Sequence, residues 1–342
     1  MPATDTTTAA AAETHWPAAA AQARLHVVSG KGGTGKSTVA ASLALALAAG
    51  GRKVLLVEVE GRQGIAQMFD TPPLPHEEKR IAVAAEGGEV RALAIDVETA
   101  LLEYLDMFYN LGFAGRAMRR VGAIEFATTL APGLRDVLLT GKIKECVVRT
   151  EKNGRRTYDA VVVDAPPTGR VVNFLDVTRA MADLAKSGPI RAQSEGVIEL
   201  LHSDQTVVHL VTLLEELPVQ ETLDALEELR AADLRTGAVI VNRAKAHELP
   251  EDALQAAADG AVDTEALRAG LDVAGIKLSD DDIAGLVTQT VQHALRVRTE
   301  QASRARLAKA GAEMVELPAL ADGVDLGALY ELAEVLAEQG VR

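Results

Sequence analysis

The sequence contains one cysteine, few aromatic residues (3%) and no apolar run of the length, about 18 residues, that crosses a membrane as a helix. Cys146 alone excludes an intrachain disulfide and a cysteine-rich metal cluster, and it indicates a reducing, cytoplasmic location. The seven histidines are scattered without ligand spacing, so no zinc site is predicted. Acidic residues (49) outnumber basic ones (35), and the net charge of −14 argues against a nucleic-acid or anionic membrane surface.

The rest of the composition is that of an ordinary globular protein. With 342 residues, 48% of them hydrophobic and 25% charged, the chain can build one large core or two smaller ones. Residues 1–22 are rich in alanine and threonine and lack the apolar core of a secretory signal, so we expect a disordered or loosely docked tail there. We expect the remainder, 23–342, to form a single domain.

A glycine-rich segment follows the apolar run 25–28 and opens into a helical pattern at 39–45. A strand, a glycine-rich loop and a helix in this order are the context that a phosphate-binding loop requires. The segment consists of Gly30, Lys31, Gly32, Gly33, Thr34, Gly35, Lys36, Ser37 and Thr38. Its glycines let backbone N–H groups face the phosphates, while Lys36 reaches the β- and γ-phosphates and the Ser37 hydroxyl binds Mg²⁺. The sequence therefore predicts a magnesium-dependent nucleotide site.

Further apolar runs alternate with helical patterns along the chain. These runs span 53–60, 89–95, 158–164, 206–213, 237–243 and 312–318. The repeated order of strand, helix and strand implies parallel pairing with right-handed crossovers. We therefore expect an α/β fold with a mostly parallel, twisted sheet of about seven or eight strands flanked by helices.

Asp164 stands at the end of one of these runs, and open α/β sheets bind their ligands at the carboxyl ends of the strands. A nucleoside triphosphatase needs a carboxylate there to hold magnesium, so Asp164 joins Ser37 as a candidate metal residue. In the loop that follows, Thr168 and Gly169 are candidates for a switch that senses the γ-phosphate.

Two helical stretches, at about 97–152 and 173–204, separate strands and are expected to be insertions that form a helical subdomain. They permit two interpretations, an insertion with its own small core or an apolar groove for a client helix. Elsewhere, Ser279–Asp282 is interpreted as a helix N-cap cluster. His26 and His209 fall in strands and are expected to be satisfied core residues, and Cys146 is expected to be an inert thiol.

Together these motifs resemble those of the ArsA-like ATPases, a family that includes the arsenite-pump ATPase and the ATPase that guides tail-anchored membrane proteins. The resemblance extends over roughly residues 24–342. Residues 30–38 match the family's P-loop, and Asp164–Arg170 is similar to its second switch, with substitutions. The resemblance implies that the nucleotide is ATP, that Asn242 recognises adenine and that Pro318 begins the loop covering it.

Lys31 resembles the signature lysine of a deviant P-loop found in a group of dimeric ATPases. In that group the early lysine reaches across the dimer to the partner's nucleotide. The alternative interpretation is a solvated loop lysine. Only one P-loop is present, so the resemblance implies that the active unit contains two chains.

Two departures from the family affect the expected activity. Gln67 falls where the family has the aspartate that positions the attacking water, and a glutamine can orient water but cannot take its proton. Slow hydrolysis is therefore expected. The Cys-x-x-Cys zinc clamp of the tail-anchored branch is also missing, so that dimer contact is not expected.

The leading hypothesis is a dimeric ATP-binding and ATP-hydrolysing switch that acts on a protein client or membrane-protein partner through its helical subdomain. Lys31, Lys36, Gln67 and Asp164 are its expected catalytic residues. Gln67 leaves open a paralogous heterodimer with weak or no ATPase activity of its own. The energising subunit of an arsenite pump is a further alternative, although one cysteine cannot supply three thiolates. Neither nucleic-acid binding nor direct membrane insertion is expected.

Overall fold

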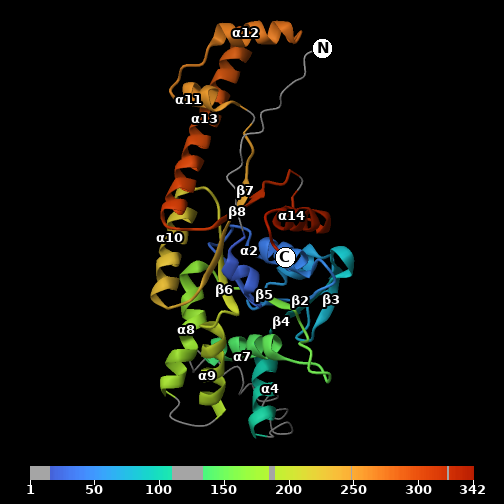
Figure 1. The fold of residues 1–342 in the computed structure, drawn as a ribbon. Coiled ribbons are helices and arrows are strands. Elements are labelled where there is room, and N and C mark those ends of the chain that lie inside the picture. Colours follow the sequence, from blue (N-terminus) through green and yellow to red (C-terminus); the bar gives the residue numbers. More distant parts are fainter. Residues whose placement is uncertain (1–15, 110–133, 185–188, 248, 322) are drawn as a thin grey trace.

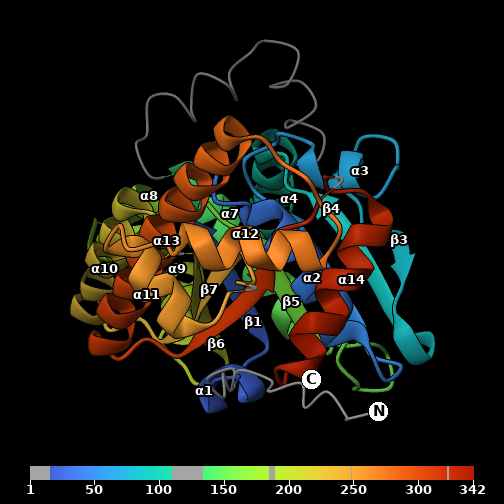
Figure 2. The same cartoon turned by 90° about the horizontal axis from the view of Figure 1, so that it is seen from above.

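The structure is a computed structural model that describes residues 16–109, 134–184, 189–247, 249–321 and 323–342. Within these ranges eight strands form one sheet, in the order β3-β4-β2-β5-β1-β6-β7-β8 (Figures 1 and 2). The strands are β1 (Leu25–Gly30), β2 (Lys53–Glu58), β3 (Lys79–Val83), β4 (Glu89–Ala94), β5 (Ala160–Asp164), β6 (Thr206–Thr212), β7 (Thr236–Ala244) and β8 (Met314–Pro318). All neighbouring strands pair in parallel except β3 and β4. The expected α/β fold with a mostly parallel sheet is confirmed.

The edge strand β3 is the one strand that the apolar runs do not reveal. Most of its residues are exposed, because it lies at the border of the sheet and pairs antiparallel with β4 alone. The inner strands β1 and β6 are instead buried at every position. Strands covered on both faces read as continuous apolar runs, whereas an edge strand need not.

Helices cover both faces of the sheet. The core on one face includes Leu43 from α2 and Leu332 from α14, and the core on the other includes Phe174 from α8 and Leu226 from α10. The helices are α1 (Ala18–Gln22), α2 (Lys36–Ala48), α3 (Gly64–Met68), α4 (Val97–Tyr109), α7 (Leu134–Val148), α8 (Thr168–Leu184), α9 (Pro189–Leu201), α10 (Glu216–Ala231), α11 (Glu251–Ala258), α12 (Thr264–Val273), α13 (Asp280–Lys309) and α14 (Leu326–Glu338), with a short 3₁₀ turn η1 (Ala85–Gly87).

Helices α4, α7, α8 and α9 contact one another at one end of the molecule (Figure 1). They fall in the two stretches where helical insertions are expected, although α8 already begins at Thr168, directly after the loop that follows β5. Residues 110–133 of the first stretch and 185–188 of the second lie outside the described residues. The separate subdomain, and the choice between its own core and a client groove, stay predictions.

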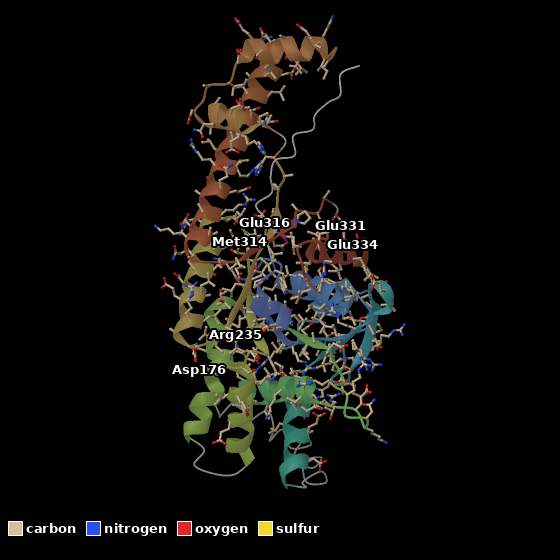
Figure 3. All side chains as sticks on the ribbon, viewed as in Figure 1. Asp176, Arg235, Met314, Glu316, Glu331 and Glu334 are labelled. Carbon is tan, nitrogen blue, oxygen red and sulfur yellow. The ribbon has the colours of Figure 1, made fainter. Side chains whose placement is uncertain are left out.

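The long helix α13 extends away from the sheet together with α11 and α12 (Figures 1 and 3). There Ala294 and Val297 of α13 pack in a small buried cluster with Leu254 and Ala257 of α11. Ser279 and Asp282 exchange the two side-chain bonds of a capping box, which confirms the predicted N-cap cluster. The other end of α13 is held on the sheet, because Arg304 forms a 2.6 Å ion pair with Glu316 of β8, labelled in Figure 3.

The described part of the N-terminal segment is docked on the body, one of the two states expected for it. The Trp16 side chain is buried, and its ring stacks on His209 with 4.9 Å between centroids. The backbone N–H of Trp16 donates to the Gln339 carbonyl. Residues 18–22 then form α1. One buried indole ring thus anchors residues 16–22, a segment whose alanine-rich composition does not by itself predict packing.

His26 and His209 form a buried pair between β1 and β6. The Ala238 N–H donates to His209 Nδ1, so the His209 proton lies on Nε2, from which it can donate across 3.1 Å to His26 Nδ1. His26 then carries its proton on Nε2, a buried atom without a hydrogen-bond partner among the described residues. The prediction of core histidines is confirmed, but the prediction that both are satisfied is wrong for this atom.

Acid is expected to weaken the fold through His26, because burial lowers its pKa from 6.5 to about 4. Above about pH 6.5 neither state binds the proton; below it only the unfolded state does, so stability falls by about 1.4 kcal/mol per pH unit down to about pH 4. Urea denaturation at about pH 7.5 and 5.5 should show a smaller loss in His26→Gln than in the wild type. His247→Gln, which removes an exposed histidine, should keep the full loss. Equal losses in all three proteins would contradict this role of His26.

Candidate nucleotide-binding site

The glycine-rich segment lies at the carboxyl end of the central strand β1 and leads into α2. Gly33 and Gly35 both have φ of +90°, a conformation that strongly favours glycine. A Cβ at Gly35 would also collide with the Asn242 side chain, and one at Gly30 with the Val211 carbonyl. Gly33 is therefore favoured by backbone conformation, Gly30 by space and Gly35 by both.

The N-terminus of α2 is arranged to receive an anion. Gly35 occupies the N-cap position and has no side chain, so the first-turn N–H groups of α2 receive no side-chain cap from this residue. Uncapped N–H groups and the helix dipole together favour bound phosphate. Lys36 is the first residue of α2 and is only 9% exposed, so most of its side chain is shielded from bulk water beside this helix end.

Ser37 and Asp164 meet beside this helix end, as a magnesium site requires. The Ser37 hydroxyl donates to Asp164 Oδ2 across 2.6 Å. Burial raises the pKa of Asp164 to about 6, against the opposing effects of the Ser37 bond and Lys36, and Glu58 and Glu60 raise it further. A carboxylate held in such surroundings gains more from a nearby cation than an exposed one does.

The donor set fits Mg²⁺ bound together with a nucleotide. Hydroxyl and carboxylate oxygens are ligands that Mg²⁺ prefers, and it usually completes its shell with phosphate and water oxygens. Across the part of the chain that the structure describes, no three His, Cys, Asp or Glu residues are grouped to hold a metal ion. A magnesium ion at Ser37 and Asp164 would therefore depend on the phosphates for its remaining ligands.

Asn242 connects the P-loop to a cavity between β7 and α13. Its Nδ2 donates to the Thr34 carbonyl across 2.8 Å, and its Oδ1 accepts the Arg243 N–H. A cavity of about 550 Å³ adjoins it and is lined on its far side by Arg296 and Thr299 of α13. Pro318 ends β8 opposite Ala244, another residue that lines this cavity. The position is suitable for a nucleotide base.

Lys31 is bound within its own chain. Its Nζ lies 2.7 Å from Glu221 Oε1 on α10, and the two side chains are 26% and 35% exposed. An ion pair this accessible to water contributes little to stability and can exchange partners. Lys31 is thus held at the edge of the P-loop by a contact that a stronger anion could replace.

The second-switch region lies against the P-loop. Ser29 Oγ donates to the Pro166 carbonyl across 2.6 Å, and Thr168 is buried at the start of α8. Gly169 follows in the first turn of that helix and is exposed. A movement of the phosphate-binding loop would therefore be transmitted to α8 through this contact.

Two predicted residues are not brought to the phosphate end of the site. Gln67 is exposed on α3, and among the described residues its side chain makes no hydrogen bond with the P-loop or Asp164. The Thr38 hydroxyl faces α3 instead, with Met68 Sδ at 3.6 Å. Neither observation tests a role for these residues with nucleotide bound, so both assignments stay predictions.

Glu58 and Glu221 are residues of the site that the sequence analysis does not identify. Glu58 is a charged residue inside the apolar run 53–60, and that contrast is the signal that could have drawn attention to it. Glu221 has no comparable signal, because acidic residues are common on an exposed helix such as α10. Its pairing with Lys31 joins positions 190 residues apart.

No helix among the described residues is long and apolar enough to cross a membrane.

The anion-transporting ATPase family model matches residues 23–191, a range that includes the P-loop and Asp164 but ends before Asn242 and Pro318.

Curated relatives extend the similarity over nearly the whole chain. The chain is 65% identical over 338 residues to the protein named ATPase BagA of Mycobacterium tuberculosis, covering 98% of this chain and 99% of that one. It is 26% identical to a putative arsenical pump-driving ATPase of Aquifex aeolicus, covering 67% and 81% of the two chains. It is 23% identical to the ATPase GET3 of Lachancea thermotolerans, covering 63% and 70%.

Proposed function

This chain belongs to the ArsA-like family of ATPases, and from that premise we propose that it is a dimeric, magnesium-dependent ATP switch of the cytoplasm. The observation that carries the proposal is the 2.6 Å contact between Ser37 and Asp164 beside the uncapped start of α2. A hydroxyl and a buried carboxylate meeting at a phosphate-binding helix end have the chemistry of a nucleoside triphosphatase site.

In this proposal the P-loop residues hold the triphosphate and place its γ-phosphate for attack by water. Backbone N–H groups from Gly32 to Thr38 surround the phosphate oxygens, and Lys36 neutralises the charge on the β- and γ-phosphates. Ser37 and Asp164 would hold Mg²⁺, which supplies charge neutralisation at the phosphates when it is bound. Asn242 and Pro318 would hold the base next to the cavity between β7 and α13.

Binding would be converted into movement through the second switch. Thr168 and Gly169 lie in the first turn of α8. A contact from Gly169 to the γ-phosphate would therefore shift the N-terminal end of that helix. Helix α8 packs against α7 and α9. We propose that this helical group acts on a protein client or a membrane-protein partner, which fits the position of the helices at one end of the molecule (Figure 1).

Dimerisation would complete the site by releasing Lys31 from Glu221 and offering it to the partner's nucleotide. The polyphosphate carries more charge than a single carboxylate and is the stronger partner for a lysine. The exchange would make ATP hydrolysis depend on dimer closure. Neither nucleic acid nor direct membrane insertion forms part of the proposal.

Two alternatives use the same site. Exposed Gln67 leaves open a heterodimer in which a paralogue supplies the better catalytic switch. An arsenite-pump role is suggested by the name of the Aquifex relative. Burial of Cys146, however, raises the pKa of its thiol to about 12, so the chain's one thiol is not available as a thiolate ligand. Stimulation of ATP turnover by arsenite would support the pump role.

The first experiment is steady-state ATP turnover by the purified chain alone, with Mg²⁺ present. We expect slow but measurable turnover that disappears when EDTA removes Mg²⁺. Tight ATP binding without turnover would favour the heterodimer, and co-purification from the native host should then recover a paralogue. Absence of ATP binding would contradict the proposed function.

A further inference from the structure

Glu58 is a buried charge next to the candidate metal site, and the proposed mechanism does not use it. It is the last residue of β2 and is 2% exposed. In the parallel register of β2 and β5, its Cα partner is Asp164, so the two residues occupy equivalent positions at the carboxyl ends of adjacent strands (Figure 1). Parallel neighbours lie about 4.8 Å apart. A carboxylate rarely occupies such a place unless its oxygens are bonded.

Both oxygens of Glu58 accept backbone N–H groups from the segment that follows β2. Oε1 accepts the Gln63 N–H across 2.5 Å, and Oε2 accepts the Ile65 N–H at 3.4 Å. Both amides belong to the beginning of α3, the helix that carries Gln67. We propose that Glu58 is a positioning residue that fixes the segment 61–68 beside the phosphate and metal site. This inference rests on the proposed function for its catalytic consequence, but not for the contact itself.

The segment 61–68 needs such an anchor. Gly61 and Gln63 both have positive φ, +68° and +58°, so the chain reverses sharply between β2 and α3. At its far side the segment is held by the Gln63 side chain, which donates to the Leu74 carbonyl and accepts the Leu74 N–H. Ile65 is buried in the core. Glu58 supplies the anchor at the side nearest Asp164.

The charge of Glu58 also makes its bonds to Gln63 and Ile65 sensitive to whether a cation occupies the site. Glu58 and Asp164 are close enough to influence each other electrostatically. A cation held between Asp164 and the phosphates therefore attracts the Glu58 carboxylate as well. Because the same carboxylate holds Gln63 and Ile65, occupation of the site is transmitted to the segment that carries Gln67.

The test compares the wild type with Glu58→Gln, which keeps the size of the side chain but presents an NH₂ group to one of the two N–H donors. Hydrogen exchange over residues 60–69, measured by mass spectrometry, is expected to become roughly tenfold faster. The slowing of exchange that Mg²⁺ and a non-hydrolysable ATP analogue cause in the wild type should be lost. The kcat for ATP should fall roughly tenfold with KM within twofold, since the P-loop contacts are untouched.

Asp159→Asn is the matched control. The Asp159 carboxylate accepts the Lys53 N–H across 2.8 Å at the opposite end of β2, so it makes the same kind of bond away from the site. This variant should change neither the exchange over 60–69 nor kcat. Glu58→Asp, which retains the charge but withdraws the carboxylate by one methylene, gives a second variant in case Glu58→Gln does not fold.

Unchanged exchange over 60–69 in both Glu58 variants would overturn the anchor. Faster exchange with an unchanged kcat and an unchanged response to the analogue would overturn the positioning role, leaving a bond that only stabilises the fold. If the wild type binds the analogue but does not turn over ATP, the hydrolysis proposal fails separately. In that case loss of the analogue's effect in Glu58→Gln still supports the positioning role, and its retention overturns it.

Discussion

Replacing Lys36 with alanine is expected to abolish measurable ATP binding. Lys36 begins α2 and is 9% exposed, so its ammonium group would meet the phosphates in a site that excludes most of the water. Hydrogen bonds between charged groups are worth roughly 1.5–3 kcal/mol each, and losing two of them weakens binding by at least about a hundredfold. Isothermal titration calorimetry with ATP and Mg²⁺ measures this loss directly.

Two further variants separate the loss of the charge from damage to the fold. Lys36→Met keeps most of the side-chain volume and should bind ATP as poorly as Lys36→Ala. Lys309→Ala removes an exposed lysine at the end of α13 and should bind ATP like the wild type. Wild-type affinity in Lys36→Ala would show that the glycine-rich segment is not the phosphate site.

Replacing Lys31 with alanine is expected to remove ATP turnover while leaving ATP binding nearly unchanged. In the single chain, Lys31 is paired with Glu221 at 2.7 Å, so its loss takes no ammonium away from the P-loop of its own chain. If it reaches the partner's phosphates, its loss removes charge stabilisation from the transition state, an effect of about 10²–10³ in kcat. Turnover and calorimetry on the same preparation measure the two effects.

A mixing experiment distinguishes action across a dimer from action within one chain. Lys31→Ala and Lys36→Ala chains are each expected to be inactive alone. In a mixed dimer, one site combines the intact Lys36 of the first chain with the intact Lys31 of the second, so activity should return. Glu221→Gln, which frees Lys31 without removing it, should keep turnover. Full activity in Lys31→Ala alone would identify Lys31 as a loop lysine without a catalytic role. Failure of the mixture of two inactive variants to regain activity would contradict action across the dimer.

Several features of this protein follow from the sequence because they depend on neighbours along the chain. A phosphate-binding loop is a local structure, so the glycines and Lys36 between an apolar run and a helical pattern were sufficient to predict one. The same is true of the capping box at Ser279 and Asp282, whose partners are three residues apart. Asp164 could be placed because the carboxyl ends of parallel strands meet at one edge of the sheet.

Only the tertiary structure could identify contacts that join distant segments. Lys31 meets Glu221 across 190 residues, and the Trp16 ring reaches His209 across the sheet. Lys31 and Glu221 are partly exposed, Trp16 precedes an alanine-rich segment and His209 lies in an apolar strand. Nothing in these sequence neighbourhoods specifies the partner. The edge strand β3 was missed for a related reason, since pairing with a single neighbour requires no apolar pattern of its own.

The candidate site combines both kinds of information. Its phosphate-binding part is determined by sequence, because backbone conformation and a helix start are local properties. Its switch segment is determined by the fold, because Glu58 becomes an anchor only when β2 lies beside β5 and the chain turns back at Gln63. Local spacing can therefore specify where a phosphate binds, whereas long-range packing decides which groups are placed to respond to it.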